Sequence, residues 1–147
     1  MDTISRITFR RFLLGQQGLW PGRRFKGLSG TTKAIHQMQG LQLDPLNIAA
    51  RSQEIALSGR VLDFKLEHLY QAAYEKRGFF DYGGWLFMYP MHEFPYWRLH
   101  MKHREEQGLH YESFKHPPDD LLKFVLNELR TRGPLGNRDF GGEAVKV

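Results

Sequence analysis

The segment Leu41-Gln42-Leu43-Asp44-Pro45 alternates apolar and polar side chains, in a chain whose other apolar residues mostly recur at helical spacing. Such alternation is typical of a short strand, in which successive side chains point to opposite faces. Glycine or proline follows most of the helical segments, which predicts that the helices are short. The sequence therefore predicts a mainly α-helical fold with a small β-element.

On such a strand Gln42 and Asp44 share one face, about 7 Å apart. An amide and a carboxylate at this spacing can address one water molecule or one sugar, which is what hydrolysis of a glycosidic bond requires. The alternative is the solvent face of an edge strand, with Asp44-Pro45 forming an ordinary turn. The spacing alone favours that alternative, so a catalytic reading needs further support.

The composition describes one domain of ordinary size. The chain has 147 residues and 41% hydrophobic residues, which is enough to build a core. It contains no cysteine, so a disulfide framework and a thiolate zinc site are excluded, and a cytosolic protein fits best. Arginines interrupt the N-terminal apolar residues, unlike a signal peptide, and no apolar stretch reaches membrane-spanning length.

Basic residues concentrate in the first part of the chain. Residues 1–60 hold nine Lys and Arg against three Asp and Glu, whereas residues 61–147 hold twelve against thirteen. A polyanionic partner near the predicted strand explains this bias, and a solvated basic surface explains it equally well. Lys33, Arg51 and Arg60 are candidates for charge-assisted contacts to phosphates, although each alone is more often a solvated charge.

Apolar spacing and capping residues predict the elements. A strand is expected over residues 85–89. Helices are expected over residues 4–14, from Thr31 or Thr32 to Met38, over 47–58, after an Asp63 cap, over 92–107, and from Asp119 or Asp120 to Gly133-Pro134. Pro117 and Pro118 mark a boundary, so we expect one domain over residues 1–116 and the start of a second over 117–147.

Aromatic residues are dense in the second half of the chain. The stripe Leu66, Leu69, Tyr70, Ala73 and Tyr74 follows helical periodicity and predicts a core-facing surface. Stacking on an unpaired base is a second use for aromatic rings, but core packing is the simpler expectation for Trp85, Phe87, Tyr89, Tyr96 and Trp97.

His100 and His103 lie three residues apart on a predicted helix, close to the spacing at which two imidazoles meet one metal. The sequence offers no third ligand beside them. We therefore expect no metal and no other cofactor.

Short helices around a small strand element in a basic segment suggest a winged helix or another helix-turn-helix relative. Residues 39–60 add a more specific signal, because they resemble the AlkZ/YcaQ-like family of winged-helix DNA glycosylases. That family carries a Gln-apolar-Gln or Gln-apolar-Asp motif, and Gln42-Leu43-Asp44 looks like the second form. The similarity continues through Pro45-Leu46-Asn47 with Arg51, Phe80-Asp81-Tyr82, residues 90–101, Gly133-Pro134-Leu135 and Arg138-Asp139-Phe140.

The resemblance implies a monofunctional glycosylase that removes N7-alkylated guanine from double-stranded DNA and unhooks interstrand crosslinks. It implies tandem winged-helix domains and a further C-terminal part, so this chain is expected to be the N-terminal portion of such an enzyme. We expect a monomer in the cytoplasm, associated with the nucleoid when it acts on DNA. The rival hypotheses are a non-catalytic winged-helix DNA-binding protein of the regulator type and a protein-interaction domain with an incidental basic face.

Gln42 and Asp44 take the family's catalytic positions, and Asn47 and Arg51 become candidate DNA contacts beside Lys33 and Arg60. The chemistry suits these residue types, because N7 alkylation already makes guanine a cationic leaving group. An ionised Asp44 then stabilises an oxocarbenium-like sugar and activates water, which Gln42 orients. No lysine nucleophile is needed, so strand cleavage through a Schiff base is not expected.

Overall fold

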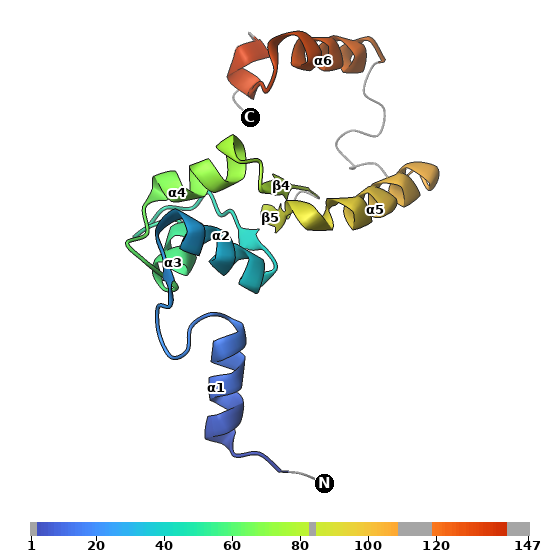
Figure 1. The fold of residues 1–147 in the computed structure, drawn as a ribbon. Helices are drawn as coiled ribbons and strands as arrows, with labels where there is room; N and C mark the ends of the chain where they lie inside the picture. Colours follow the sequence, from blue (N-terminus) through green and yellow to red (C-terminus); the bar gives the residue numbers. More distant parts are fainter. Residues whose placement is uncertain (1–2, 83–84, 109–118, 141–147) are drawn as a thin grey trace. The chain divides into compact units, whose positions relative to one another are not determined.

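The computed structural model describes residues 3–82, 85–108 and 119–140, and these ranges are mostly helical with a few short strands (Figure 1). This confirms the prediction of a mainly α-helical fold with a small β-element. The chain divides into two compact units, residues 1–100 and residues 101–147, and each is described by itself. Within the described ranges no helix has both the length and the apolar character needed to cross a membrane.

Helix α1 spans Arg6–Gln16, about two residues later than predicted at each end. It starts there because Ser5 caps it, with the Ser5 hydroxyl accepting the Thr8 N–H at 3.1 Å. No residue of α1 is buried. Its last turn is attached by Gln37, whose side-chain amide donates to the Gly15 carbonyl oxygen at 2.8 Å.

Helix α2 spans Gly27–Met38 and directly follows strand β1 (Phe25–Lys26). The predicted start at Thr31 or Thr32 is wrong, because both threonines lie inside α2. Their hydroxyls donate to carbonyl oxygens four residues earlier, at 3.0 and 3.3 Å. At Gly30 the helix packs against β1 so closely that a Cβ atom would lie 2.8 Å from the strand's backbone.

Strand β2 covers only Leu41–Gln42, and helix α3 spans Ser52–Ser58. Both elements are shorter than predicted, because residues 43–51 form neither regular strand nor helix. Arg51 precedes α3 in an extended conformation, with φ −70° and ψ 150°, so the predicted helix cannot begin at Asn47. Strand β2 therefore ends before Asp44. Strand alternation does not place Gln42 and Asp44 on one face, in contrast to what the sequence predicts.

Strand β3 (Val61–Leu62) pairs in parallel with β1. Helix α4 spans Leu66–Tyr70 and continues as the π-helical turn η1 over Gln71–Glu75. The predicted cap at Asp63 is wrong. Asp63 has a left-handed backbone, with φ 53°, and its carboxylate lies 3.5 Å from the Lys26 ammonium.

Strands β4 (Phe79–Asp81) and β5 (Phe87–Pro90) complete a three-stranded antiparallel sheet with the order β2-β5-β4. The strand β5 begins two residues later than predicted. Leu86, the residue before it, has a left-handed φ of 55°, so a regular strand cannot start earlier.

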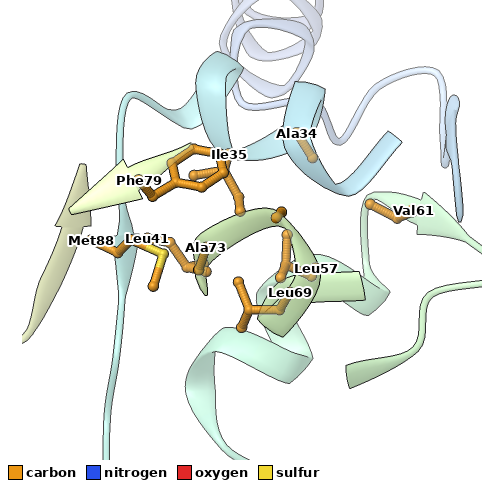
Figure 2. Close-up of a cluster of buried hydrophobic side chains, with 10 residues drawn as sticks. Ala34, Ile35, Leu41, Leu57, Val61, Leu69, Ala73, Phe79 and Met88 are labelled. Carbon is orange, nitrogen blue, oxygen red and sulfur yellow. The ribbon is translucent and has the colours of Figure 1, made fainter. Parts of the chain in front are cut away.

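The core of the first unit lies where α2, α3 and α4 meet the sheet (Figure 2). Ile35, Leu57 and Val61 are fully buried. The other buried hydrophobic residues are Ala34, Leu41, Leu69, Ala72, Ala73, Phe79 and Met88. Leu41 therefore anchors β2 in the core, at the start of the segment that carries Asp44.

A second group of side chains packs beside the sheet, and we call Phe80, Tyr89, Phe94 and Trp97 the aromatic layer. Its last two residues come from helix α5 (Phe94–Glu106), which follows the short 3-10 helix η2 (Met91–Glu93). The ring centroids of Tyr89 and Trp97 are 4.4 Å apart. These two half-buried rings pack against each other beside the sheet and do not belong to the core cluster. Core packing was wrong for Trp85 and Tyr96, which are 73% and 72% exposed.

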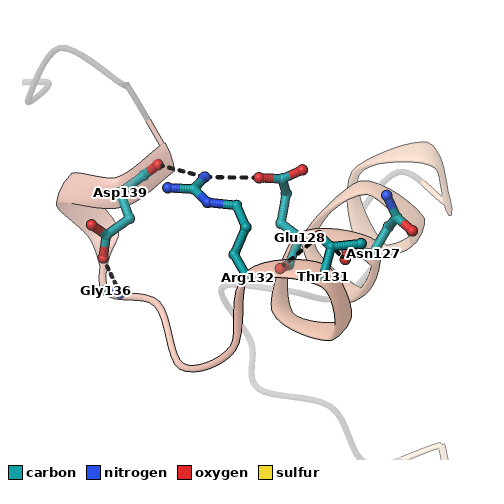
Figure 3. Close-up of polar contacts among 6 residues, drawn as sticks. All are labelled: Asn127, Glu128, Thr131, Arg132, Gly136 and Asp139. Carbon is teal, nitrogen blue, oxygen red and sulfur yellow. Dashed lines mark hydrogen bonds and ion pairs between the residues drawn. The ribbon is translucent and has the colours of Figure 1, made fainter.

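The second unit contains helix α6 (Asp119–Arg132) and the 3-10 helix η4 (Asn137–Phe140). Helix α6 ends just before the predicted stop at Gly133-Pro134. Arg132 joins the two elements, since its guanidinium lies 2.8 Å from the Glu128 carboxylate and 3.4 Å from the Asp139 carbonyl oxygen (Figure 3). The Asp139 carboxylate in turn accepts the Gly136 N–H at 2.7 Å, which closes the turn between them.

Candidate active site

Asp44 is half-buried just beyond β2, and its own turn holds its carboxylate. The Asp44 Oδ1 atom accepts the Leu46 N–H at 2.8 Å, the geometry of an Asx turn. In the described part of the chain, Oδ2 accepts no hydrogen bond. One carboxylate oxygen therefore fixes the side chain, and the other is available to a ligand.

Gln53 fixes the backbone of Asp44 from the opposite side. Its side-chain oxygen accepts the Asp44 N–H at 3.2 Å, and only 7% of Gln53 is exposed. The hydroxyl of Ser52 lies 3.5 Å from the same oxygen and 3.5 Å from the Gln42 carbonyl oxygen. The first turn of α3 thus attaches to the segment that leaves β2.

Sequence reasoning missed Gln53, which holds the backbone of Asp44. The sequence does indicate that Gln53 faces the core, because Gln53 lies four residues before Leu57 and so shares its helix face. Leu57 is fully buried. A polar residue on a core-facing position requires a hydrogen-bond partner, and here the partner is Asp44.

A cavity of about 250 Å³ lies beside Asp44, and we call it the Asp44 cavity. Its charged lining residues are Asp44 and Arg51. The remainder of its described lining is mostly apolar or aromatic: Leu43, Pro45, Gln53, Leu66, Leu69, Tyr70, Tyr74, Leu86 and Met88. A carboxylate beside a mostly apolar wall is the arrangement in which electrostatic stabilisation of a cation is strongest.

Tyr70 and Tyr74 form the aromatic part of this wall. Their ring centroids are 5.9 Å apart with an interplanar angle of 27°, so the rings are stacked. They are 47% and 65% exposed, which corrects the prediction that they face the core. The π-helical turn after Tyr70 explains the difference, since its wider turn changes which residues face the core: Ala72 is buried together with Ala73.

A sequence profile of the family described as DNA glycosylase AlkZ-like matches residues 35–146. The chain belongs to this family. The match covers the Asp44 cavity, from β2 through the two tyrosines to β5, and also the second unit. Comparisons with curated proteins and with solved structures find no significant match. DNA glycosylase activity, with DNA as the substrate, is the function of this family.

Of the two predicted catalytic residues, Asp44 lines the cavity and Gln42 does not belong to its described lining. Gln42 is exposed on β2, where it pairs with Phe87. The two side chains are therefore not held together by strand geometry. Their assignment as catalytic residues stays a prediction.

The candidate DNA contacts are distributed over several elements. Arg51 lines the Asp44 cavity, whereas Lys33 on α2 and Asn47 after β2 are exposed elsewhere. Arg60 is engaged within the protein, because its guanidinium donates to the Gln17 and Ala56 carbonyl oxygens, both at 2.7 Å. Burial lowers the pKa of Arg60.

His100 and His103, whose spacing is close to that of two metal ligands, do not form a metal centre with other residues in the described ranges. No group of three or more potential ligands occurs there. The His100 ring instead packs edge-on against Tyr82 and Trp97, with centroid distances of 6.1 and 6.0 Å. His100 thus extends the packing around the aromatic layer.

Proposed function

We propose that this AlkZ-like chain hydrolyses the N-glycosidic bond of N7-alkylated guanine in duplex DNA, with Asp44 as the catalytic carboxylate. One observation carries the proposal: the half-buried Asp44 carboxylate, fixed by its own turn, lines a mostly apolar cavity within the residues that match the family. A fixed negative charge at such a place is preorganised for a sugar that becomes positive.

The reaction needs little acid catalysis, because alkylation at N7 leaves the base cationic and able to depart as a neutral molecule. As the C1′–N9 bond breaks, positive charge moves to the sugar, and the Asp44 carboxylate stabilises it. A water molecule then adds at C1′, and Asp44 accepts its proton. Gln42 orients this water from the edge of β2.

The described lining of the cavity contains no lysine, which supports a monofunctional enzyme without a Schiff-base step. Interstrand crosslinks through the same N7 position present the same glycosidic bond, so we propose that the enzyme also unhooks them.

Arg51, together with Lys33 and Asn47, contacts phosphates and positions the duplex without reading its sequence. We propose that the enzyme acts as a monomer in the cytoplasm and at the nucleoid.

We further propose a winged-helix fold for residues 1–116. The order of α2, β2, α3, α4, β4 and β5, with the sheet order β2-β5-β4, supports it. That order is helix, strand, helix, helix and a hairpin, and the first strand adds to the hairpin. We propose that residues 117–147, which include α6, belong to a second winged-helix domain.

A non-catalytic DNA-binding protein is the second candidate. The observation in its favour is the bond from the Leu46 N–H to Asp44, because the same carboxylate geometry occurs in ordinary turns. Such a protein would bind duplex DNA through its basic residues and release no base.

The decisive experiment measures single-turnover release of N7-methylguanine from duplex DNA by the wild type and by Asp44→Asn. Asparagine still accepts the Leu46 N–H, so the variant removes the charge and preserves the turn. We expect the rate to fall roughly a hundred- to a thousandfold. The matched control is Asp63→Asn, at an exposed, left-handed position that asparagine tolerates.

Equal rates for wild type and Asp44→Asn would disprove the catalytic role of Asp44. Duplex binding by the wild type without base release would favour the non-catalytic candidate. In either case, we expect DNA affinity to fall steeply with added salt, because phosphate contacts release counterions.

A further inference from the structure

We propose that Tyr70 and Tyr74 form the binding surface for the damaged base and select it by its positive charge. This inference rests on the proposed function, since it takes the N7-alkylated guanine as the ligand of the Asp44 cavity. It adds a recognition element that is separate from the catalytic carboxylate.

The two tyrosines lie where a ligand of Asp44 would meet them. Tyr70 and Tyr74 belong to the lining that also includes Asp44 and Met88, so a ligand that reaches the carboxylate also meets the rings. Their stacked arrangement, with centroids 5.9 Å apart, presents them as one aromatic surface. A base attached to a sugar at Asp44 has this surface within the same cavity.

The two tyrosine rings contribute little to packing of the core. They remain 47% and 65% exposed, although they belong to a helix that buries Leu69. The arginines that stack on rings in the described ranges are Arg11 on Trp20 and Arg24 on Phe25. No described cation covers Tyr70 or Tyr74, so their faces are accessible to a ligand.

The Asp44 cavity matches a single cationic base in size and chemistry. A volume of about 250 Å³ is smaller than the roughly 300–1,000 Å³ of pockets for drug-sized ligands, which suits a single base. Every base stacks on aromatic rings, but a cationic base also gains from the negative face of tyrosine. Unmodified guanine is neutral and lacks this second contribution.

The charged residues of the cavity are compatible with a cation. Asp44 attracts it, and Arg51 repels it. No ion pair joins these two side chains in the described ranges, and Arg51 is exposed. Arg51 can therefore extend toward a neighbouring phosphate, which leaves Asp44 and the two rings to face the base.

The test separates binding from chemistry with two uncleavable duplexes. Both carry a 2′-fluoro sugar, which slows loss of the base by destabilising the oxocarbenium ion. One contains N7-methylguanine, which is cationic, and the other contains 7-methyl-7-deazaguanine, which has the same shape and is neutral. The measured quantity is the ratio of their dissociation constants for each protein.

We expect wild type to bind the cationic duplex about five- to tenfold more tightly than the neutral one. The double variant Tyr70→Leu with Tyr74→Leu should reduce this ratio to the smaller value that the Asp44 charge alone gives. The double Tyr→Phe variant should keep the wild-type ratio, because the ring faces remain. Tyr96→Leu is the matched control, an exposed tyrosine outside the described cavity lining, and should behave as wild type.

An undiminished ratio in the double Tyr→Leu variant overturns this proposal, while release of N7-methylguanine by the wild type would still uphold the proposed function. A ratio that depends on the tyrosines in a wild type that releases no base supports the recognition surface and overturns the catalytic function. Circular dichroism of each variant verifies that it is folded.

Discussion

The aromatic layer and the Tyr70–Tyr74 pair contain the same kind of residue but differ in what surrounds them. In the layer, Phe80 meets Phe94 edge-on at 5.1 Å, and Trp97 covers Tyr89 at 4.4 Å. The tyrosine pair touches mainly itself and the wall of the Asp44 cavity.

This difference shows that aromatic density does not reveal whether rings stabilise the fold or contact a ligand. A half-buried ring that packs among other rings contributes burial and edge-to-face contacts to stability. A stacked pair that is half exposed contributes little to stability and keeps its faces for other molecules. The predictions below test this distinction, beginning with the largest expected effect on the free energy of unfolding.

Trp97→Ala should lower the free energy of unfolding by about 2–4 kcal/mol, because it removes the ring that contacts Tyr89 and Phe80. Urea denaturation followed by circular dichroism measures the change. Tyr96→Ala, on the exposed side of the same helix, serves as the control. A loss below about 1 kcal/mol for Trp97→Ala would mean that the aromatic layer is not a stabilising unit.

Gln53→Leu should lower the free energy of unfolding by about 1–3 kcal/mol, because the Asp44 N–H loses its acceptor. Base release should slow as well, since the carboxylate is then less firmly positioned. The exposed Gln16→Leu is the control. If Gln53→Leu lowers the free energy of unfolding but leaves the rate of base release unchanged, then Gln53 stabilises the fold and does not position the Asp44 carboxylate for catalysis.

The double variant Tyr70→Leu with Tyr74→Leu should change the free energy of unfolding by less than about 1 kcal/mol, as expected for exposed positions. The same urea titration as for Trp97→Ala gives a direct comparison. If the double variant loses as much free energy of unfolding as Trp97→Ala, then Tyr70 and Tyr74 stabilise the fold in the same way as the aromatic layer.

The smallest effect concerns the hydroxyl of Tyr89, whose pKa is raised by burial and then by the negative charges of Asp81 and Glu93. A raised folded-state pKa means that the contribution of this group to stability is complete below the ordinary tyrosine pKa of about 10. It is lost as the pH rises from there through the folded-state value.

Absorbance of the phenolate should therefore show a tyrosine that ionises later than the ordinary range, and Tyr89→Phe should remove that late step. The unfolding free energy of Tyr89→Phe should also depend less on pH in this alkaline window. A late step that persists in Tyr89→Phe would assign it to another tyrosine.

Much of the helical framework follows from local chemistry. The stop of α6 before Gly133-Pro134 and the helical segment after Pro90 were predicted, because proline and glycine act on their own backbone. The caps at Thr31 and Asp63 were predicted wrongly. Close packing of Gly30 on β1 and the ion pair of Asp63 with Lys26 depend on residues distant in the sequence.

The sequence by itself determined the family, because residues 35–146 match the family profile. Only the tertiary structure decided that Asp44 lies past the end of β2, that Gln53 holds it, and that Tyr70 and Tyr74 join it at one cavity. The physical reason is that periodicity records which residues share a face of one element. What lies opposite that face, a core or a cavity, depends on segments that folding brings together.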